Sequence, residues 1–407
     1  MSEPVRIGLL GRGTVGGAFE RLLGERAGAV EALTGRRLEL AGVLTRSEGD
    51  FSAILERSDL IVELLGGTDP AREYLLDSLR AGRPVVTANK QVLAQHGDDL
   101  FAVAREAGVQ LRFEAAVAGV IPIVRTIQES LGVTEIAKVF GIVNGTTNFI
   151  LSEMASTGAA YTEVLARAQE LGYAEADPSD DVGGADAAAK MAILARLAFH
   201  TPVTLSEVAY EGIEAIQPDD LAYAKELGLS LKLLGVAERR EGGVSVRVFP
   251  CFLYGGHPLA PVEGPFNAVM VEAPAITEVT MSGPGAGGVQ TASAVLGDVV
   301  SILAGDAPVP ETLERLPIVT DVASSFYLYL EVADRPGVLA QIARVLGDNG
   351  ISVKSVVQRG IGEDARLVMV VHECLESRFA AAVKEIAELG DLRSPPRSIR
   401  VIEEEFV

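Results

Sequence analysis

The sequence has 407 residues, with 35 Lys and Arg against 56 Asp and Glu, which gives a net charge of −21 at pH 7. A hydrophobic share of 48% excludes a disordered chain, and at roughly 100–200 residues per domain the length suggests two or three domains. The acidic balance disfavours nucleic-acid binding because phosphates repel it, and no apolar run reaches the roughly 18–20 residues that span a membrane. Two cysteines far apart, Cys251 and Cys374, fit a reducing compartment, so we expect a cytoplasmic enzyme.

In the first 115 residues, short apolar runs alternate with amphipathic stretches. Strands are predicted at Val5–Leu10, Leu38–Leu44, Leu60–Leu64, Pro84–Thr87 and Gln110–Glu114. The helix-like stretches Ala71–Ala81 and Asp98–Ala107 are each followed by a glycine that can end a helix. This alternation predicts an α/β domain with a parallel sheet covered by helices on both faces.

The rest of the chain has a different pattern. A long Ala-rich helix is predicted at Ala185–Phe199, with strands at Val244–Phe252 and Asn267–Val271 and a further helix at Thr291–Leu303. After a linker marked by Pro308, Pro310 and Pro317, six elements follow in the order strand, helix, strand, strand, helix, strand, namely Phe326–Val332, Val338–Asn349, Ser352–Arg359, Arg366–Val371, Ser377–Leu389 and Ile399–Glu403. This order is that of a ferredoxin-like module.

A glycine-rich motif, G-x-G-x-x-G, stands at Gly11, Gly13 and Gly16, directly after the first predicted strand and before a helix. With 43 glycines in the chain the motif alone is weak, but this context is the one that a dinucleotide pyrophosphate site requires. A glycine-rich turn without a ligand is the alternative. The second strand ends near Arg46 and not at an acidic residue, which favours NADP over NAD because a guanidinium suits a 2′-phosphate; a solvated loop charge is the alternative.

Lys90 follows a strand whose carboxyl end should border the ligand crevice, although a surface turn would also explain it. Asp186 and Lys190, four residues apart, share one predicted helix stripe with the apolar Ile193 and Leu197. Charges on an inward stripe must be paired or change their pKa, which makes them candidates for catalysis, while a structural ion pair would look the same.

An acidic cluster precedes this helix, and its members are Glu175, Asp177, Asp180 and Asp181. It suits the binding of an ammonium group, with a solvated acidic loop as the alternative. The four histidines are scattered and show no spacing typical of a transition-metal site.

Together these segments resemble homoserine dehydrogenases over essentially the whole chain. The stretches that carry the resemblance are Gly11–Gly16, Val85–Lys90, Phe113–Pro122, Gly141–Phe149, Gly172–Lys190 and Gly283–Gly288. The C-terminal module resembles an ACT domain through Asp334–Leu339 and Asn349–Ile351. The resemblance implies a Rossmann-type NAD(P)-binding domain (1–130), an α+β substrate and dimerisation domain (131–310, with 283–305 returning to the first domain) and an ACT regulatory domain (320–407).

The resemblance also implies a reaction and its residues: NAD(P)H-dependent reduction of L-aspartate 4-semialdehyde to L-homoserine, a step toward threonine and methionine. Lys190 would be the proton donor, Lys90 would support the carbonyl oxygen and the cofactor, and Asp186 would act beside them. The implied binding residues are Glu175, Asp180, Asp186 and Lys90 for the substrate, Gly11, Gly13, Thr14, Val15, Gly16, Arg46, Lys90 and Gly287 for NADP, and Glu114, Val117, Gly119 and Ile121 for a monovalent cation, Na⁺.

Further implications are threonine as an allosteric effector and a homodimer or homotetramer. Two alternatives to this function are a related NADP-dependent oxidoreductase with another amino-acid substrate, and a nucleotide-binding amino-acid sensor without turnover. The inward Asp186 and Lys190 argue against the sensor, because a sensor needs no proton donor there.

Overall fold

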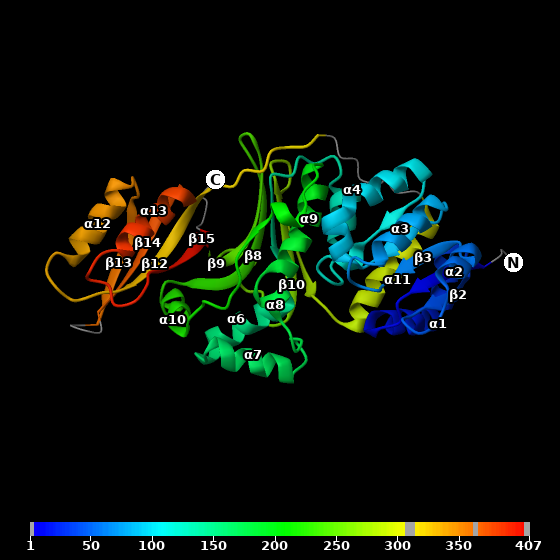
Figure 1. Cartoon of the computed structure of the whole chain (residues 1–407), viewed down its shortest axis with the longest axis horizontal. Coiled ribbons are helices and arrows are strands. Elements are labelled where there is room, and N and C mark those ends of the chain that lie inside the picture. Colours follow the sequence, from blue (N-terminus) through cyan, green and yellow to red (C-terminus); the bar gives the residue numbers. More distant parts are fainter. Residues whose placement is uncertain (1–3, 306–313, 361–364, 403–407) are drawn as a thin grey trace.

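The structure, a computed structural model, describes residues 4–305, 314–360 and 365–402. Figure 1 shows three parts in a row, with the N-terminal domain at one end, the middle domain in green, and the C-terminal module in orange and red at the other end. The predicted fold class, a Rossmann-type α/β domain followed by an α+β domain and a ferredoxin-like module, is confirmed. The linker residues Pro308 and Pro310 and the predicted strand end Glu403 lie outside the described residues. Within the described part of the chain, no helix is long and apolar enough to cross a membrane.

The N-terminal domain contains a parallel sheet with the strand order β2-β1-β3-β4-β5. Its strands are β1 (Val5–Leu10), β2 (Leu38–Leu44), β3 (Leu60–Glu63), β4 (Val85–Thr87) and β5 (Leu111–Arg112), and its helices are α1 (Thr14–Thr34), α2 (Phe51–Arg57), α3 (Ala71–Arg80), α4 (Lys90–Ala107) and α11 (Gly288–Ala304). Every residue of β3 and β4 is buried, as expected for a parallel sheet covered on both faces. Helix α11 comes from far along the chain and packs against α1 (Figure 1).

Helix α4 begins earlier than the sequence pattern predicts. The prediction started this helix at Asp98, whereas its first residue is Lys90. The reason is the preceding Asn89, whose side-chain oxygen accepts the backbone N–H of Val92 at 3.2 Å and so caps the helix. A non-helical residue inside α4, His96 (φ −131°), interrupts the periodic pattern and explains why only the second half was predicted.

The middle domain and the C-terminal module share one sheet, with the strand order β11-β10-β6-β8-β9-β15-β12-β14-β13 and β7 beside β9. The middle strands are β6 (Lys138–Ile142), β7 (Ala209–Tyr210), β8 (Leu229–Arg240), β9 (Gly243–Tyr254), β10 (Phe266–Ala273) and β11 (Thr277–Pro284). The helices here are α5 (Ile123–Arg125), α6 (Gly145–Thr157), α7 (Tyr161–Glu170), α8 (Ser179–Val182), α9 (Ala185–Phe199) and α10 (Pro218–Glu226), with short 3₁₀ or π turns at Glu114–Ala116, Thr126–Ser130 and Leu205–Glu207.

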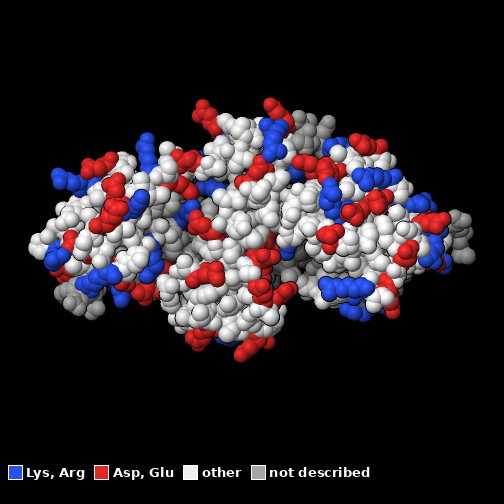
Figure 2. Space-filling model, viewed as in Figure 1, with Lys and Arg blue, Asp and Glu red and all other residues white. Residues whose placement is uncertain are grey.

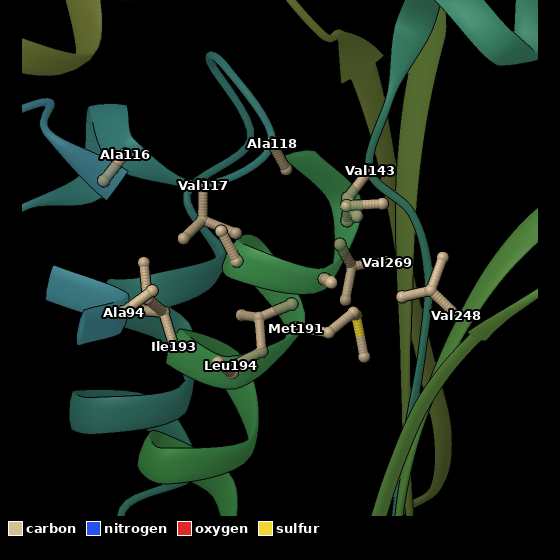
Figure 3. Packing of buried hydrophobic residues seen from close by; sticks show 14 of the residues in the cluster. Ala94, Ala116, Val117, Ala118, Val143, Met191, Ile193, Leu194, Val248 and Val269 are labelled. Carbon is tan, nitrogen blue, oxygen red and sulfur yellow. The ribbon is translucent and has the colours of Figure 1, made fainter. Parts of the chain in front are cut away.

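Helix α9 has the predicted bounds but no polar face. All its residues are buried except Ala185 and Lys190. The predicted inward face with Asp186, Ile193 and Leu197 is therefore buried, and the other faces are covered too, because the helix lies between α4 and the middle sheet. Figure 3 shows Met191, Ile193 and Leu194 among apolar side chains of both domains. The sheet approaches α9 closely, because a Cβ atom at Gly235 would lie 2.4 Å from Met191 Cγ.

The C-terminal module contains β12 (Ala323–Glu331), α12 (Val338–Asp348), β13 (Val353–Arg359), β14 (Arg366–Leu375), α13 (Glu376–Ala387) and β15 (Arg397–Ile402). Its last strand, β15, pairs in parallel with β9 of the middle domain, where Arg400 faces Cys251 and Ile402 faces Leu253. Beside this seam Arg400 donates to Glu376 at 2.7 Å and to Glu211 of the middle domain at 2.8 Å. The module is therefore joined to the middle domain by a continuous sheet and by ion pairs.

Candidate active site

Asp186, in the first turn of α9, is the centre of a buried charged cluster. The residue is 3% exposed, and its carboxylate accepts from Lys190 Nζ at 2.7 Å and from Asn144 Nδ2 at 2.8 Å. Lys90, the first residue of α4, forms an ion pair with the other carboxylate oxygen. Since Lys90 follows a strand of the N-terminal sheet and Asp186 belongs to the middle domain, this ion pair joins the two domains at the carboxyl edge of the parallel strands.

The electrostatics of the cluster favour the charged forms of Asp186 and Lys90. Burial alone would raise the pKa of Asp186, but the two lysine charges hold it well below its usual range. Burial alone would lower the pKa of Lys90, but the Asp186 carboxylate raises it above its usual value. The Lys190 ammonium also donates to the Val143 carbonyl oxygen at 2.7 Å, and its side chain is only 13% exposed. The Lys190 side chain is thus held in place by Asp186 and the Val143 carbonyl oxygen.

Asn144 and Asp181 complete the cluster. Asp181 belongs to the predicted acidic cluster, whereas Asn144 was not a predicted site residue. Asn144 caps α6 by accepting the Thr147 N–H at 2.9 Å, and its amide donates to Asp181 at 2.7 Å as well as to Asp186. The sequence held a signal for Asn144, because an Asn directly before a helix is a preferred cap. Burial and the nearby Asp186 raise the pKa of Asp181.

Two predicted substrate-binding residues lie apart from this cluster. Glu175 and Asp180 are both exposed, on the loop before α8 and at its start. Figure 2 shows acidic side chains gathered over α7 and α8 on this face, with few basic ones between them. Asp180 still contributes to the positive shift of the Lys90 pKa, so it lies within electrostatic range of the cluster.

The glycine motif forms a tight turn at the end of β1. Gly11 has a φ of 100°, and a Cβ atom at Gly16 would lie 2.0 Å from the Gly11 carbonyl oxygen, so both positions require glycine. The turn leads into α1, with Gly13 at its N-cap and Thr14 and Val15 as its first residues. A helix N-terminus with such a close backbone turn fits a pyrophosphate group.

The second glycine loop, Gly283–Gly288, lies against the first, Gly11–Gly16. A Cβ atom at Gly288 would lie 2.9 Å from Thr14 Cγ2, and Gly287, with a φ of 134°, caps α11. The two loops therefore bring residues that are far apart in the sequence to one binding edge. Arg46, which follows β2, is exposed.

The predicted cation-binding segment surrounds the buried Glu114. Its carboxylate accepts the backbone N–H groups of Val124 at 2.7 Å and Arg125 at 3.0 Å, while its own N–H donates to Asp298 at 2.8 Å. Burial and the Asp298 charge raise the pKa of Glu114 to about 7, and burial raises that of Asp298 to about 6. Arg125 pairs with Asp298 at 3.3 Å and offsets part of this negative charge, so the Glu114 carboxylate is the group that would face a bound cation. Gly119 has a φ of 67°, and a Cβ atom there would lie 2.5 Å from the Pro284 carbonyl oxygen, so this segment also touches the second glycine loop.

These features define a nicotinamide-nucleotide-dependent oxidoreductase with an appended ferredoxin-like module. Family models match the homoserine dehydrogenase NAD-binding domain at residues 11–114, homoserine dehydrogenase at 122–300 and the ACT domain at 326–391. The homoserine dehydrogenase of Corynebacterium glutamicum is 47% identical over 341 residues, which cover 81% of this chain and 77% of that one.

Two solved structures extend the comparison. A homoserine dehydrogenase from Thiobacillus denitrificans has a TM-score of 0.94 at 38% identity and covers 98% of this chain and 99% of its own. A hyperthermophilic archaeal homoserine dehydrogenase in complex with NADPH has a TM-score of 0.64 at 26% identity, covering 75% of this chain and 99% of that chain. The chain belongs to the homoserine dehydrogenase family, and it is an NAD(P)-dependent oxidoreductase with a C-terminal ACT domain.

Proposed function

We propose that this protein reduces L-aspartate 4-semialdehyde to L-homoserine with NADPH, a step in threonine and methionine biosynthesis. The observation that carries the proposal is the Lys190 ammonium, fixed by Asp186 and Val143 and sharing the Asp186 carboxylate with Lys90 of the N-terminal domain. An aldehyde that accepts a hydride develops negative charge on oxygen, and a preorganised cation stabilises that charge.

Lys190 is proposed as the proton donor. An ammonium group has three N–H donors, and among the described residues two of them are directed to Asp186 and Val143. The third is available for the substrate oxygen, to which it delivers a proton as the alkoxide forms. Reduced nicotinamide supplies the hydride when bound. In the reverse direction the neutral Lys190 amine accepts the hydroxyl proton.

Lys90 and the acidic groups are proposed to orient the substrate. Lys90 is 34% exposed at its side chain, so it can reach both a carbonyl oxygen and the cofactor. Glu175, Asp180 and Asp186 are proposed to bind the α-ammonium or the hydroxyl end of the amino acid, since a carboxylate and an ammonium form strong charge-assisted hydrogen bonds.

NADP is proposed as the preferred cofactor, held by the two glycine loops and Lys90, with Arg46 at the 2′-phosphate. NAD is proposed to bind with lower affinity. The NADPH complex of the archaeal relative supports this choice. A monovalent cation, Na⁺, is proposed at Glu114, with the carbonyl oxygens of Val117, Gly119 and Ile121 as the remaining ligands. The buried negative charge of Glu114 and Asp298 supports a cation there.

Threonine is proposed to inhibit the enzyme through the ACT domain, in a homodimer or homotetramer. A route from this domain to the site supports the idea. Arg400 of β15 binds Glu211, whose carbonyl oxygen would lie 2.9 Å from a Cβ atom at Gly184, the residue before α9. Two positions on, the Ile213 N–H donates to the Val182 carbonyl oxygen at 2.9 Å. A shift of β15 would thus reach the start of the helix that carries Asp186.

The test is the purified protein with aspartate semialdehyde and NADPH, followed by absorbance at 340 nm. Loss of absorbance that depends on both reactants is the expected result. No loss with this aldehyde refutes the proposed reaction, and faster turnover of another amino-acid aldehyde would identify a different substrate.

A further inference from the structure

Glu63, the last residue of β3, is a buried carboxyl group that the proposed reaction does not use. Its exposed fraction is 0%, and it lies on the carboxyl edge of the parallel sheet, next to the end of β4. A carboxyl group that is buried costs free energy unless it is hydrogen-bonded. Burial raises the pKa of Glu63, while the hydrogen bonds from Thr87, Leu65 and Asn89 act in the opposite direction.

The Glu63 carboxyl accepts hydrogen bonds from both strand ends. Thr87 Oγ1 donates to Oε2 at 2.5 Å, and the Leu65 N–H donates to Oε1 at 2.7 Å. The Asn89 amide donates to Oε1 at 3.4 Å. Since a hydroxyl has a single hydrogen, which Thr87 directs to Glu63, a lone pair of the same oxygen is free to accept the Asn89 N–H at 2.9 Å. Glu63 therefore sets the direction of the whole hydrogen-bond chain.

The series of hydrogen bonds from Glu63 ends at the start of α4. The Asn89 side chain caps the helix at Val92 and donates to the Gly67 carbonyl oxygen at 2.7 Å. The next residue is Lys90, whose ammonium pairs with Asp186 across the domain boundary. Both the backbone and the side chain of Asn89 are thus held by groups that Glu63 organises.

We propose that Glu63 is a positioning residue for the dehydrogenase reaction: through Thr87 and Asn89 its carboxyl group holds the first turn of α4 so that the Lys90 ammonium stays beside Asp186 and the substrate. The proposal rests on the proposed function for the role of Lys90. A merely structural role, in which Glu63 only stabilises the N-terminal sheet, is the competing explanation.

The first test is Glu63→Gln, which keeps the size but replaces one acceptor with a donor. That donor faces either the Thr87 hydroxyl or the N–H groups of Leu65 and Asn89, so the start of α4 is no longer held. We expect kcat to fall roughly 10- to 100-fold, since a displacement of about 1 Å can cost 10²-fold, with the KM for NADPH unchanged. Thr87→Val, a second variant of nearly equal size, should show the same pattern and carries the test if Glu63→Gln does not fold.

A matched control is Ser78→Ala, which removes another buried hydroxyl of the same domain, one bound to the Tyr74 carbonyl oxygen at 2.6 Å. It should lower the melting temperature without changing kcat. The decisive measurement is the effect of Glu63→Gln in a Lys90→Met background. If Glu63 acts through Lys90, Glu63→Gln should cause no further decrease of kcat in the Lys90→Met background. An equal fold-decrease of kcat in the wild-type and Lys90→Met backgrounds, or no decrease in either, overturns the inference.

A readout independent of turnover is the pKa of Lys90, followed by NMR of ¹³C-labelled lysine side chains. Displacement from Asp186 should lower this pKa in Glu63→Gln, because the Asp186 charge is what raises it. An unchanged pKa refutes the inference. A wild-type protein without turnover refutes the proposed function instead, so the two failures are distinguishable.

Discussion

The role of Lys190 can be tested by Lys190→Met, which removes the ammonium and keeps the side-chain length. The structure predicts that the variant folds, because the Asp186 carboxylate retains Lys90 and Asn144 as partners. The stability lost should be about 1.5–3 kcal/mol, the usual contribution of a hydrogen bond to a charged group. The turnover number should fall by a factor of about 10²–10⁴, the usual range for a general acid, which corresponds to roughly 3–5 kcal/mol of activation free energy.

The assay is steady-state kinetics at 340 nm in both directions, together with NADPH binding by fluorescence titration. NADPH affinity should be retained, since Lys190 projects from α9 of the middle domain and not from the glycine loops. The matched control is Lys232→Met, because Lys232 is also buried and also donates to a carbonyl oxygen, that of Val262 at 2.5 Å, outside the cluster. Its kcat should equal that of the wild type. An unchanged kcat in Lys190→Met, or a loss explained entirely by weaker NADPH binding, would show that Lys190 is not the proton donor.

Three further predictions concern the cofactor, pH and regulation. Arg46→Ala should weaken NADPH binding more than NADH binding, and equal losses measured by titration would contradict contact with the 2′-phosphate. Burial lowers the pKa of His257 from 6.5 to about 4. As the pH falls from 6.5 to 4, the unfolded state binds a proton that the folded state does not, so the free energy of unfolding should decrease by at most about 3 kcal/mol. In urea unfolding, the stability of His257→Leu should therefore depend less on pH between about 7 and 4 than that of the wild type, and the same pH dependence in both proteins would refute this. Threonine should inhibit the wild type, and Arg400→Met should reduce that inhibition while basal turnover stays; a flat threonine curve for the wild type would refute the effector, and an unchanged curve for the variant would refute the route through Glu211.

Much of the architecture could be predicted from the sequence because its strands are short, mostly apolar runs that alternate with amphipathic helices. Strands β1 and β2 and helix α9 have the predicted bounds. Helix α2 was missed, since it has only seven residues and its main signal is one capping residue, Asp50. The pairing of β15 with β9 is also absent from the local pattern, because it depends on contacts between residues that are far apart in the sequence.

The site could be predicted only in part. Asp186 and Lys190 lie one helical turn apart, so a local pattern brings them together. The assignment of Lys90 and Asp186 to one site came from the resemblance, and their ion pair was not predicted, because only tertiary packing brings the two domains together. Asp181 was predicted only as a member of the acidic cluster, and Asn144 and Glu63 were missed, since each contacts a neighbouring side chain that the local pattern does not reveal. Asn144 and Asn89, however, both carry the signal of an Asn before a helix, and attention to caps would have found them.

The shared sheet makes the ACT module part of the middle domain's fold. One edge of β9 is covered in turn by Ile318, β7 and β15. Cutting the chain before β12 would remove β15, which pairs with Cys251–Leu253 along one edge of β9. An open strand edge can pair with other molecules. A shortened enzyme of this kind should therefore tend to aggregate. A variant meant to test the proposed inhibition by threonine should instead keep β15 in place.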